Sequence, residues 1–533
     1  MNALDLLIVV LSLAIVVAVG LIASRKRSNT AEGYFLASGK MPWFIIGSAF
    51  VSTSVSSEQI VGTTGAAYEH GMVIANWEWW TLPTYTLLIL LFIPIYLRNR
   101  VTTVSDFLAR RYGPLCRDIY SWVMLIAYVV VFLVPVLYSG SLAIADLVPW
   151  AAAWQPWRLQ IVLWSMVVLV AAYTVKGGLV SVMWTDAVQC LMLVGGGLLL
   201  YFYALRQIPG GWSAMAAANP ERFHLYRPPG DPIAPFPGLV FASFGVFLFY
   251  QAGNQVMVQR VLGARSIWDG MMGIVFAGFI NLIRPLVTCF LGFIVYHWIR
   301  DLKRADPLPN KDLAFSFVLK TLSPDWGLRG IVLAGFFAAV MSTLSALANS
   351  TATLFSLEVY RKLKHDASDR TLVRIGQVAS LSSLVIAAII APSVERFGGI
   401  FAYFQTGVTY LATPFISVML LGILWRRTNY PGALAGIIGG LLIQIALGIA
   451  LPRVWPNLHF LYIASIAQAL TIFVVVVTSL ITSPPRPEQW QPFQWSPALL
   501  AQLKSDARPW YQNMWLWAGL YAAIWIGIYV WFW

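Results

Sequence analysis

The sequence predicts an all-α integral membrane protein, and three observations carry that prediction. Of the 533 residues, 59% are hydrophobic and only 11% are charged, whereas a soluble domain carries roughly 25% charged residues. The apolar residues gather in about fourteen segments, most of them long enough to cross a bilayer as a helix. Lys and Arg concentrate in alternate loops between those segments, as they do in membrane proteins.

The predicted membrane helices follow one another closely along the whole chain. The loops between them are too short to fold as separate domains, so we expect one polytopic bundle over residues 1–533. The aromatic residues of the last span fit anchoring at the membrane interface and packing against lipid. We predict spans at 4–24, 42–65, 72–97, 119–146, 159–175, 180–205, 238–262, 270–298, 328–361, 374–392, 398–425, 430–451, 458–482 and 512–533.

Lys and Arg indicate which side of the membrane each loop occupies. One set of loops holds the basic clusters 25–27, 98–100, 110–111, 361–365 and 426–427, together with Lys176, Arg260 and Arg265. That side is expected to be cytoplasmic, which places both termini outside a cell membrane, either inner or plasma. The net charge of +13 is then a topology signal, and it requires neither a nucleic-acid partner nor an obligate protein partner.

Four ionisable residues fall inside predicted spans: Glu58, Glu78, Asp186 and Arg284. A charged side chain at the centre of a membrane helix costs about 3 kcal/mol on insertion scales. Each is therefore expected to face the protein interior or a water-filled cavity. For any one of them alone, a structural ion pair or a position near the interface is an equally good explanation.

Two spans contain runs of polar and small residues where a lipid-facing helix would be apolar. Span 42–65 reads STSVSSEQIVGTTG over 52–65, and span 238–262 reads YQAGNQ over 250–255. Such residues weaken helix propensity, and non-helical backbone at this depth survives only where it lines a cavity. Helix–helix packing by small and hydroxyl residues is the alternative.

The two polar runs lie five spans apart, which is the layout of an inverted repeat. Transporters of this design break the first helix of each repeat near the bilayer midplane, and the freed backbone groups bind ion and substrate. We therefore predict that both helices break. Residues 42–205 then form the first five-helix repeat and residues 238–425 the second, with a leading helix at 4–24 and additional helices over 430–533.

Span 328–361 carries a third polar feature, the adjacent hydroxyls of Ser342 and Thr343. The carbonyl of Ala339 lies one turn below Thr343 and can offer lone pairs to a cation. Na⁺ is a hard ion that prefers oxygen ligands of this kind. Taken alone, the hydroxyls are explained more simply by hydrogen bonds back to the i−4 carbonyl.

These features sit in long stretches that together resemble the sodium:solute symporter family, and within it the sodium/glucose cotransporters. The matching stretches are YFLASGKMPWFIIGSAFVSTSVSSEQIVGTTGAAYEHG, WEWW, VTTVSDFLARRYG, KGGLVSVMWTDAVQ, NQVMVQRVLGARS, AAVMSTLSALANSTAT and FISVMLLGILWRRTNYPGA. The resemblance implies a ten-helix core of the LeuT type with extra helices before and after it, transport by alternating access and no enzyme activity. An Asp with paired Arg, as in SDFLARRYG, also occurs in major facilitator proteins, but those lack the Ser342–Thr343 hydroxyl pair.

The resemblance implies Na⁺ as the coupling ion, held by three carbonyls and two hydroxyls. These fall on Ser52, Val55, Ala339, Ser342 and Thr343. Some members bind a second Na⁺ with an aspartate and further serines, and Asp186 and Ser345 match that pattern. Ala346 stands where such members have another hydroxyl, so the number of sodium ions stays open.

The sugar site of the cotransporters maps less completely. Gln59, Glu78 and Gln405 match groups that hydrogen-bond the sugar, and Tyr250 matches an aromatic that stacks on it. Other positions depart from the family's residues, as Asn281 does by replacing a lysine. With neighbouring positions, the expected solute-binding set is Ser54, Gln59, Trp77, Glu78, Thr81, Phe247, Tyr250, Gln251, Asn254, Asn281, Arg284 and Gln405.

Arg284 adds a cation that the sugar-transporter pattern lacks. It follows Asn281 by three residues and so shares its helix face. Pro285 has no N–H, which frees the Asn281 carbonyl. We expect this turn to face the solute cavity, with Arg284 paired to Glu78 or to the solute. The alternative is a structural anchor near the outer leaflet.

The leading hypothesis is a Na⁺-coupled symporter that imports a small polar solute, a sugar or polyol, across the lipid bilayer. A second hypothesis is a Na⁺ symporter for an organic acid, an amino acid or sialic acid, for which Arg284 would be the cation at that depth. A third is a membrane sensor with a transporter-like input domain. The short tail after span 458–482, a linker and one span, argues against the sensor.

Overall fold

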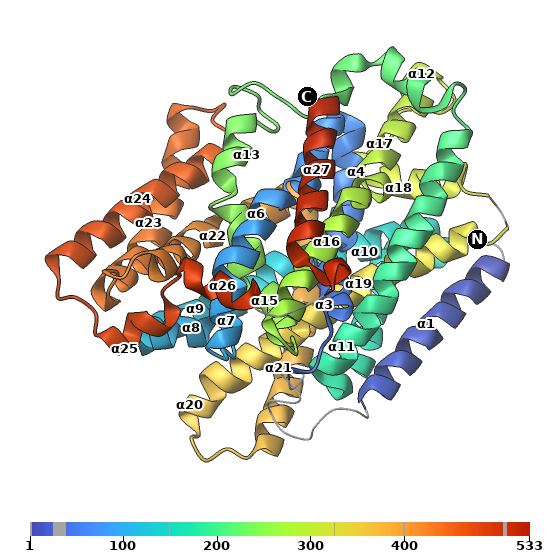
Figure 1. The fold of residues 1–533 in the computed structure, drawn as a ribbon. Coiled ribbons are helices and arrows are strands. Elements are labelled where there is room, and N and C mark those ends of the chain that lie inside the picture. The colour runs from blue at the N-terminus through green and yellow to red at the C-terminus, as the bar shows by residue number, and fades with distance from the viewer. Residues whose placement is uncertain (1–2, 25–38, 149, 325, 398–399, 505–508) are drawn as a thin grey trace.

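The computed structural model describes the chain apart from residues 1–2, 25–38, 149, 325, 398–399 and 505–508 (Figure 1). The described residues form helices joined by turns and loops, and no strand occurs among them. The predicted all-α fold is therefore confirmed.

Helices fill the N-terminal half of the described chain. Several spans are built from two or three helical pieces that continue one another. The α-helices up to residue 218 are α1 (Ala3–Ser24), α3 (Trp43–Ser54), α4 (Ser57–His70), α5 (Asn76–Trp79), α6 (Thr81–Leu87), α7 (Ile93–Arg98), α8 (Val104–Arg111), α9 (Pro114–Ala127), α10 (Val134–Leu147), α11 (Arg158–Arg206) and α12 (Gly211–Ala218).

The C-terminal half is built in the same way. Short stretches of π-helix join some of the pieces, as η7 (Phe249–Gly253) and η11 (Leu354–Tyr360) do. Its α-helices are α13 (Phe236–Ala242), α14 (Val246–Leu248), α15 (Gln255–Leu262), α16 (Ile267–Val287), α17 (Cys289–Tyr296), α18 (Ala314–Phe317), α19 (Leu328–Thr353), α20 (Arg361–Leu363), α21 (Asp369–Ile390), α22 (Ile400–Leu424), α23 (Tyr430–Val454), α24 (Phe460–Ile481), α25 (Pro487–Trp490), α26 (Pro497–Lys504) and α27 (Met514–Trp531).

By length and composition, up to 13 helical crossings occur among the described residues, against about fourteen predicted. Within the described residues, 12 helices are long and apolar enough to cross a membrane. The pair Phe236–Ala242 and Val246–Gly253, bent by 46°, adds another crossing. The remaining predicted span is the shorter apolar helix α3, which α4 continues beyond a break. Each predicted segment thus contains helix.

The connection around Lys176, expected to be a turn, has helical backbone and is part of α11, Arg158–Arg206. The two predicted spans on either side of it remain separate apolar stretches, Ala152–Ala172 and Leu179–Arg206. The side chains of residues 173–178 lie outside the described part.

Both ends of the described chain lie on one side of the bundle, here called the terminal side. The Gly330 amide donates to Asp5 Oδ1 at 2.9 Å, and the Leu225 amide donates to Phe532 O at 2.7 Å. Gln207 Nε2 donates to Leu322 O, which joins the loop after α11 to the loop before α19. The opposite side, here called the basic side, holds the loops at 99–103, 263–266 and 364–368.

The centre of the bundle is α19, which packs against α11, α1 and α21 (Figure 1). The two pieces of the first broken span pack against consecutive helices of the second half, α3 against α16 and α4 against α17. α15, at the end of the second polar run, also packs against α3, so the two polar runs meet in the middle of the molecule, where the candidate site lies.

Candidate functional site

The first polar run breaks its helix as predicted. α3 ends at Ser54, Val55 and Ser56 have extended dihedrals, and α4 begins at Ser57. The Ser54 hydroxyl donates to the Val51 carbonyl at 2.9 Å, a local bond that competes with continued helix. Since the last carbonyls of a helix have no partner within it, oxygens of this turn are available to other groups.

Helix α19 presents hydroxyls to this break. Thr343 Oγ1 donates to the Thr53 carbonyl at 3.4 Å, and Ser52 Oγ donates to Ser342 Oγ at 3.0 Å. Val55 lies at the break itself, and Ala339 lies on α19 one turn before Thr343. All five predicted sodium ligands are buried. Buried hydroxyls and carbonyls of two helix segments therefore meet at one place, which is a donor set that suits Na⁺.

A buried ion pair adjoins this oxygen cluster. Asp186 Oδ2 and Arg260 Nη2 lie 3.5 Å apart, and both side chains are 0% exposed. Ser342 Oγ donates to Asp186 Oδ1 at 2.6 Å, while Arg260 Nε donates to Thr53 Oγ1 at 3.0 Å. Ser345 Oγ donates to the Ser342 carbonyl. The two groups suggested for a second Na⁺ thus have protein partners here.

Arg260 corrects the sequence analysis, which counted it with the basic loops although it lies inside the predicted span 238–262. α15 runs to Leu262, and the Arg260 side chain is buried within the second broken span. Asp186 could have indicated the inward position of Arg260 from the sequence, because a carboxylate at that depth needs a cationic partner. The ion pair carries no net charge, which lowers the free-energy cost of burying Asp186 beside the cation site.

The span that holds the second polar run is interrupted twice, once before the run and once within it. Residues at 243–245 separate α13 from α14, and Asn254 has extended dihedrals before α15. Two tyrosine hydroxyls donate hydrogen bonds to backbone carbonyls freed by the break. Tyr96 donates to Ala252 O at 3.0 Å, and Tyr120 donates to Gly253 O at 2.7 Å. The predicted break is confirmed, but protein hydroxyls take up these two carbonyls.

A cavity lies between the two breaks. The space between its walls is about 620 Å³ when the part open to solvent is included. Nine of the predicted solute residues line it: Ser54, Gln59, Trp77, Thr81, Phe247, Tyr250, Gln251, Arg284 and Gln405. Sequence reasoning missed Trp80, Thr84, Val246, Phe404 and Val408, although most lie within one helical turn of a predicted residue.

Three predicted solute residues do not line the cavity. Asn281 Nδ2 donates to Tyr85 Oη at 2.6 Å. Asn254 Oδ1 accepts from Tyr128 Oη at 2.8 Å and caps α15. Glu78 is buried behind the wall, where Thr288 Oγ1 donates to it at 2.7 Å. The first two are engaged in holding the helices together.

Arg284 connects Glu78 to the cavity. Its Nε lies 3.3 Å from Glu78 Oε2, and its Nη1 donates to Ser54 Oγ at 3.5 Å. Arg284 lines the cavity, whereas Glu78 is fully buried. The structure thus contains the pair that the sequence suggested. Because Glu78 balances the guanidinium, the cavity wall carries little net charge at this point.

The fourth embedded ionisable residue, Glu58, lies in the first turn of α4. Its carboxylate accepts a hydrogen bond from the Ser56 hydroxyl. A negative charge is favoured at a helix N-terminus by the unpaired amides there. Glu58 is buried, like the other three, so the expectation that all four face the protein interior is confirmed.

Polar contacts close the basic side beneath the cavity. Gln259 Nε2 donates to Thr353 Oγ1 at 3.0 Å, and Ser350 Oγ donates to Gln259 Oε1 at 2.9 Å, so α15 is held against α19. Residues that line the cavity, such as Trp77 of α5 and Val246 of α14, come from parts of their spans nearer the terminal side. The lining therefore lies nearer the terminal side than these α15–α19 contacts do.

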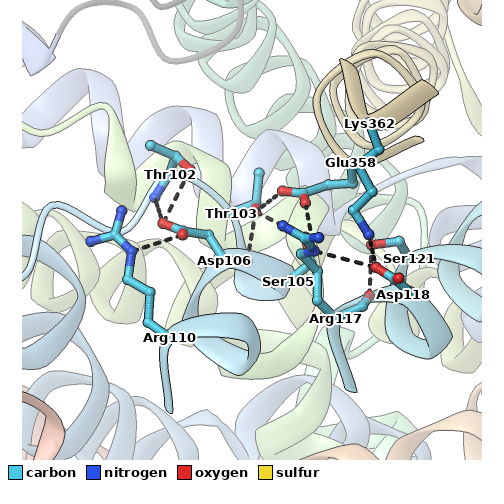
Figure 2. Close-up of polar contacts among 10 residues, drawn as sticks. All are labelled: Thr102, Thr103, Ser105, Asp106, Arg110, Arg117, Asp118, Ser121, Glu358 and Lys362. Carbon is cyan, nitrogen blue, oxygen red and sulfur yellow. Dashed lines mark hydrogen bonds and ion pairs between the residues drawn. The ribbon is translucent and has the colours of Figure 1, made fainter. Parts of the chain in front are cut away.

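The SDFLARRYG motif takes part in this closure (Figure 2). Asp106 accepts from Arg110 Nε at 2.8 Å and from the Thr102 amide at 3.0 Å, which fixes α8. Thr103 Oγ1 donates to Glu358 Oε1 at 2.6 Å, and Arg117 Nε lies 3.7 Å from Glu358 Oε2. Thr103, just before the motif, and Arg117, just after it, thus connect α8 and α9 to η11 at the end of the α19 span, while Asp106 and Arg110 of the motif form an ion pair on α8.

Comparison with known proteins identifies the kind of chain to which this arrangement belongs. The model of the sodium:solute symporter family matches residues 34–440. The sodium/glucose cotransporter of Vibrio parahaemolyticus is 30% identical over 509 residues, which are 91% of each chain. The sodium/myo-inositol cotransporter 2 of Sus scrofa is 28% identical over 95% of this chain and 81% of its own.

Solved structures agree with the fold. A Na⁺-coupled sialic acid symporter in a substrate-bound, outward-open state superposes with a TM-score of 0.79, at 21% identity over 93% of this chain and 99% of its own. Mhp1, a nucleobase-cation-symport-1 family transporter, superposes with a TM-score of 0.50 at 13% identity, over 86% and 97% of the two chains. At these identities the likeness shows the fold alone, which is of the LeuT type.

Proposed function

Because the chain belongs to the sodium:solute symporter family, it is a multi-pass membrane protein that couples Na⁺ to a small solute, and we propose that the solute is a sugar or polyol. The observation that carries the proposal is the break between α3 and α4. Oxygens suited to Na⁺ lie on one side of it, and a cavity lined by amides, hydroxyls and aromatic rings lies on the other.

The cation side of the break supports the assignment of Ser52, Val55, Ala339, Ser342 and Thr343 as sodium ligands. The hydroxyls of α19 reach the α3 carbonyl end directly, as the 3.4 Å contact of Thr343 with Thr53 O indicates. A cation placed there would hold α3 against α19. Since Asp186 is already matched by Arg260, we propose one sodium ion per transport cycle.

The cavity side supports a neutral, polyhydroxylated solute. Gln59, Gln251 and Gln405 offer amides that both donate and accept hydrogen bonds, and the rings of Trp77 and Tyr250 offer apolar faces for the C–H surface of a sugar. Arg284 does not present a free positive charge, because Glu78 lies 3.3 Å away. A carboxylate solute would want an uncompensated cation, so this pair disfavours the organic-acid alternative.

Coupling follows from the shared helix break. Ser54 and Gln59 line the cavity from the two sides of the break that also holds the cation ligands. Sodium binding fixes the position of α3 relative to α19 and therefore the shape of the cavity. A difference in sodium affinity between outward-open and inward-open states then appears as a difference in solute affinity. We propose that residues 42–205 and 238–425 are the two inverted repeats that rock between these states.

The proposal is tested by uptake into proteoliposomes under an inward Na⁺ gradient. The panel contains labelled glucose, myo-inositol, an amino acid, a monocarboxylate and sialic acid, each also measured with K⁺ replacing Na⁺. We expect accumulation of glucose, myo-inositol or both with Na⁺ and none with K⁺. Accumulation of the acids or the amino acid alone overturns the sugar assignment, and equal uptake with K⁺ overturns sodium coupling.

We also propose that the protein lies in the cell membrane with both termini outside. The native cysteines Cys116, Cys190 and Cys289 are buried, so an added surface cysteine reports its own side. Glu221→Cys on the terminal side is expected to react with a membrane-impermeant maleimide in intact cells. Asp366→Cys on the basic side should react only after permeabilisation. The opposite pattern contradicts the orientation.

A further inference from the structure

The terminal helix α27 packs on the wall of the solute cavity instead of standing apart in lipid. It lies against α6 and α16 (Figure 1). Tyr521 on its inner face is only 3% exposed, whereas Val530 and Trp531 on its outer face are 75% and 80% exposed. The expectation of lipid packing therefore holds for one face. The other face belongs to the protein core.

Close packing sets the register of α27. A Cβ added at Gly278 of α16 would lie 3.0 Å from the Tyr521 ring, so glycine permits the approach of that ring. At the end of the helix, the Leu225 amide donates to Phe532 O at 2.7 Å, and Trp533 stacks on Tyr226 with ring centroids 4.9 Å apart. Both ends of the contact are thus fixed.

From this position α27 makes three hydrogen bonds to the segment that forms one cavity wall. Tyr529 Oη donates to Asn76 Oδ1 at 2.8 Å, and Trp525 Nε1 donates to the Trp79 carbonyl. The third joins Tyr521 Oη and Thr81 Oγ1 at 2.7 Å. Thr81 lines the cavity, so this last bond connects the terminal helix directly to a solute-facing hydroxyl.

The direction of the Tyr521–Thr81 hydrogen bond follows from the partners available. A buried phenol proton needs an acceptor, and Thr81 Oγ1 is the partner that the described residues give to Tyr521 Oη. The 2.7 Å separation allows either hydroxyl to donate, and we take Tyr521 as the donor because no second acceptor for its proton is found among the described residues. Thr81 accepts the bond, which leaves its own proton for another acceptor.

A neighbouring threonine shows what the Tyr521 bond changes. Thr84 also lines the cavity, but its hydroxyl donates back to the Thr81 carbonyl at 3.0 Å. Such back-bonding is usual for threonine in a membrane helix and removes the proton from the cavity. Among the described contacts, Thr81 Oγ1 makes no such bond to its own helix, since its contact is with α27.

We propose that Tyr521 is a positioning residue of the solute site. By donating to Thr81 Oγ1, it leaves the Thr81 proton free to donate into the cavity, to an oxygen of the solute. The terminal helix thereby helps set solute affinity without touching the solute. This inference rests on the proposed function, because it requires a solute with acceptor oxygens in this cavity.

The test is the solute dependence of Na⁺-driven uptake, measured for the panel solute that the wild type accumulates. Tyr521→Phe keeps the ring against Gly278 and removes only the hydroxyl. A hydrogen bond contributes about 0.5–1.5 kcal/mol, so we expect the solute concentration for half-maximal uptake to rise roughly twofold to tenfold. Maximal uptake, and the sodium concentration for half-maximal uptake measured at saturating solute, should stay unchanged, which a general structural defect would not allow.

Two further variants complete the experiment. Tyr529→Phe removes the other tyrosine hydroxyl of α27, whose partner Asn76 does not line the cavity, and it should leave solute affinity unchanged. Thr81→Val should match the effect of Tyr521→Phe, and Tyr521→Phe should add nothing in the Thr81→Val background. Thr81→Ser keeps the hydroxyl that Thr81→Val removes, so its solute affinity should equal that of the wild type.

The outcomes separate the two proposals. Unchanged affinity in Tyr521→Phe, or effects of Tyr521→Phe and Thr81→Val that multiply, overturn the positioning role. An equal loss in Tyr529→Phe assigns α27 a purely structural role and also overturns it. If the wild type accumulates a solute other than a sugar or polyol, the proposed solute class fails, while the coupling of Tyr521 to Thr81 is still measured with that solute.

Discussion

Replacing Arg284 by alanine is expected to abolish solute uptake and to destabilise the protein by about 3–5 kcal/mol, since the other member of a buried ion pair is then left uncompensated. Glu78 would keep its bond from Thr288 but lose the guanidinium 3.3 Å away. The cavity would also lose a wall residue that contacts Ser54. Uptake in proteoliposomes and thermal unfolding in detergent measure the two losses.

Two variants separate folding from solute binding. Arg284→Lys keeps the charge but loses the planar fork, so we expect a folded protein with weakened solute affinity. The double variant Arg284→Ala with Glu78→Gln removes both charges and should recover most of the stability without recovering uptake. Wild-type solute affinity in both the lysine and the double variant would show that Arg284 has no part in the solute site.

Replacing Thr343 by alanine is expected to raise the sodium concentration for half-maximal uptake by about tenfold or more. The change removes one proposed ligand of the cation, and an interaction with a charged group contributes about 1.5–3 kcal/mol. Thr343 is a cleaner test than Ser342, whose hydroxyl also donates to Asp186. The measurement is the sodium dependence of uptake at saturating solute.

Thr351→Ala supplies the matched control. Its hydroxyl is buried on the same helix and donates back to the Leu347 carbonyl at 2.9 Å, away from the break. It should leave sodium activation unchanged. Equal sodium activation in the wild type, Thr343→Ala and Thr351→Ala would remove Thr343 from the cation site.

The sequence predicted those features that show as local anomalies in an apolar chain. Runs of Ser, Thr and Gly inside spans indicated where α3 ends and where the second broken span is interrupted. Polar and flexible residues are costly in lipid unless they line a cavity. The pairing of Arg284 with Glu78 was one of two predicted outcomes, because an embedded guanidinium that faces the cavity needs either an acidic partner or the solute.

The features that could not be predicted from the sequence are those that depend on the direction in which a side chain points. Arg260 lies near a predicted span end, and only the course of α15 shows that it turns inward to Asp186. Asn254 and Asn281 are polar and lie near the cavity, but tyrosines engage them. The terminal span is apolar all round, and such a pattern does not separate a lipid-facing side from a protein-facing one.

The central claim is that sodium and solute bind on either side of one helix break and therefore strengthen each other. Its most direct test is equilibrium binding to the purified protein, with solute affinity measured with and without Na⁺ and sodium affinity measured with and without solute. Linkage requires the two enhancement factors to be equal. We predict equal factors greater than one in the wild type and weaker sodium binding in Thr343→Ala. Solute affinity that is the same in Na⁺ and in K⁺ would contradict the account.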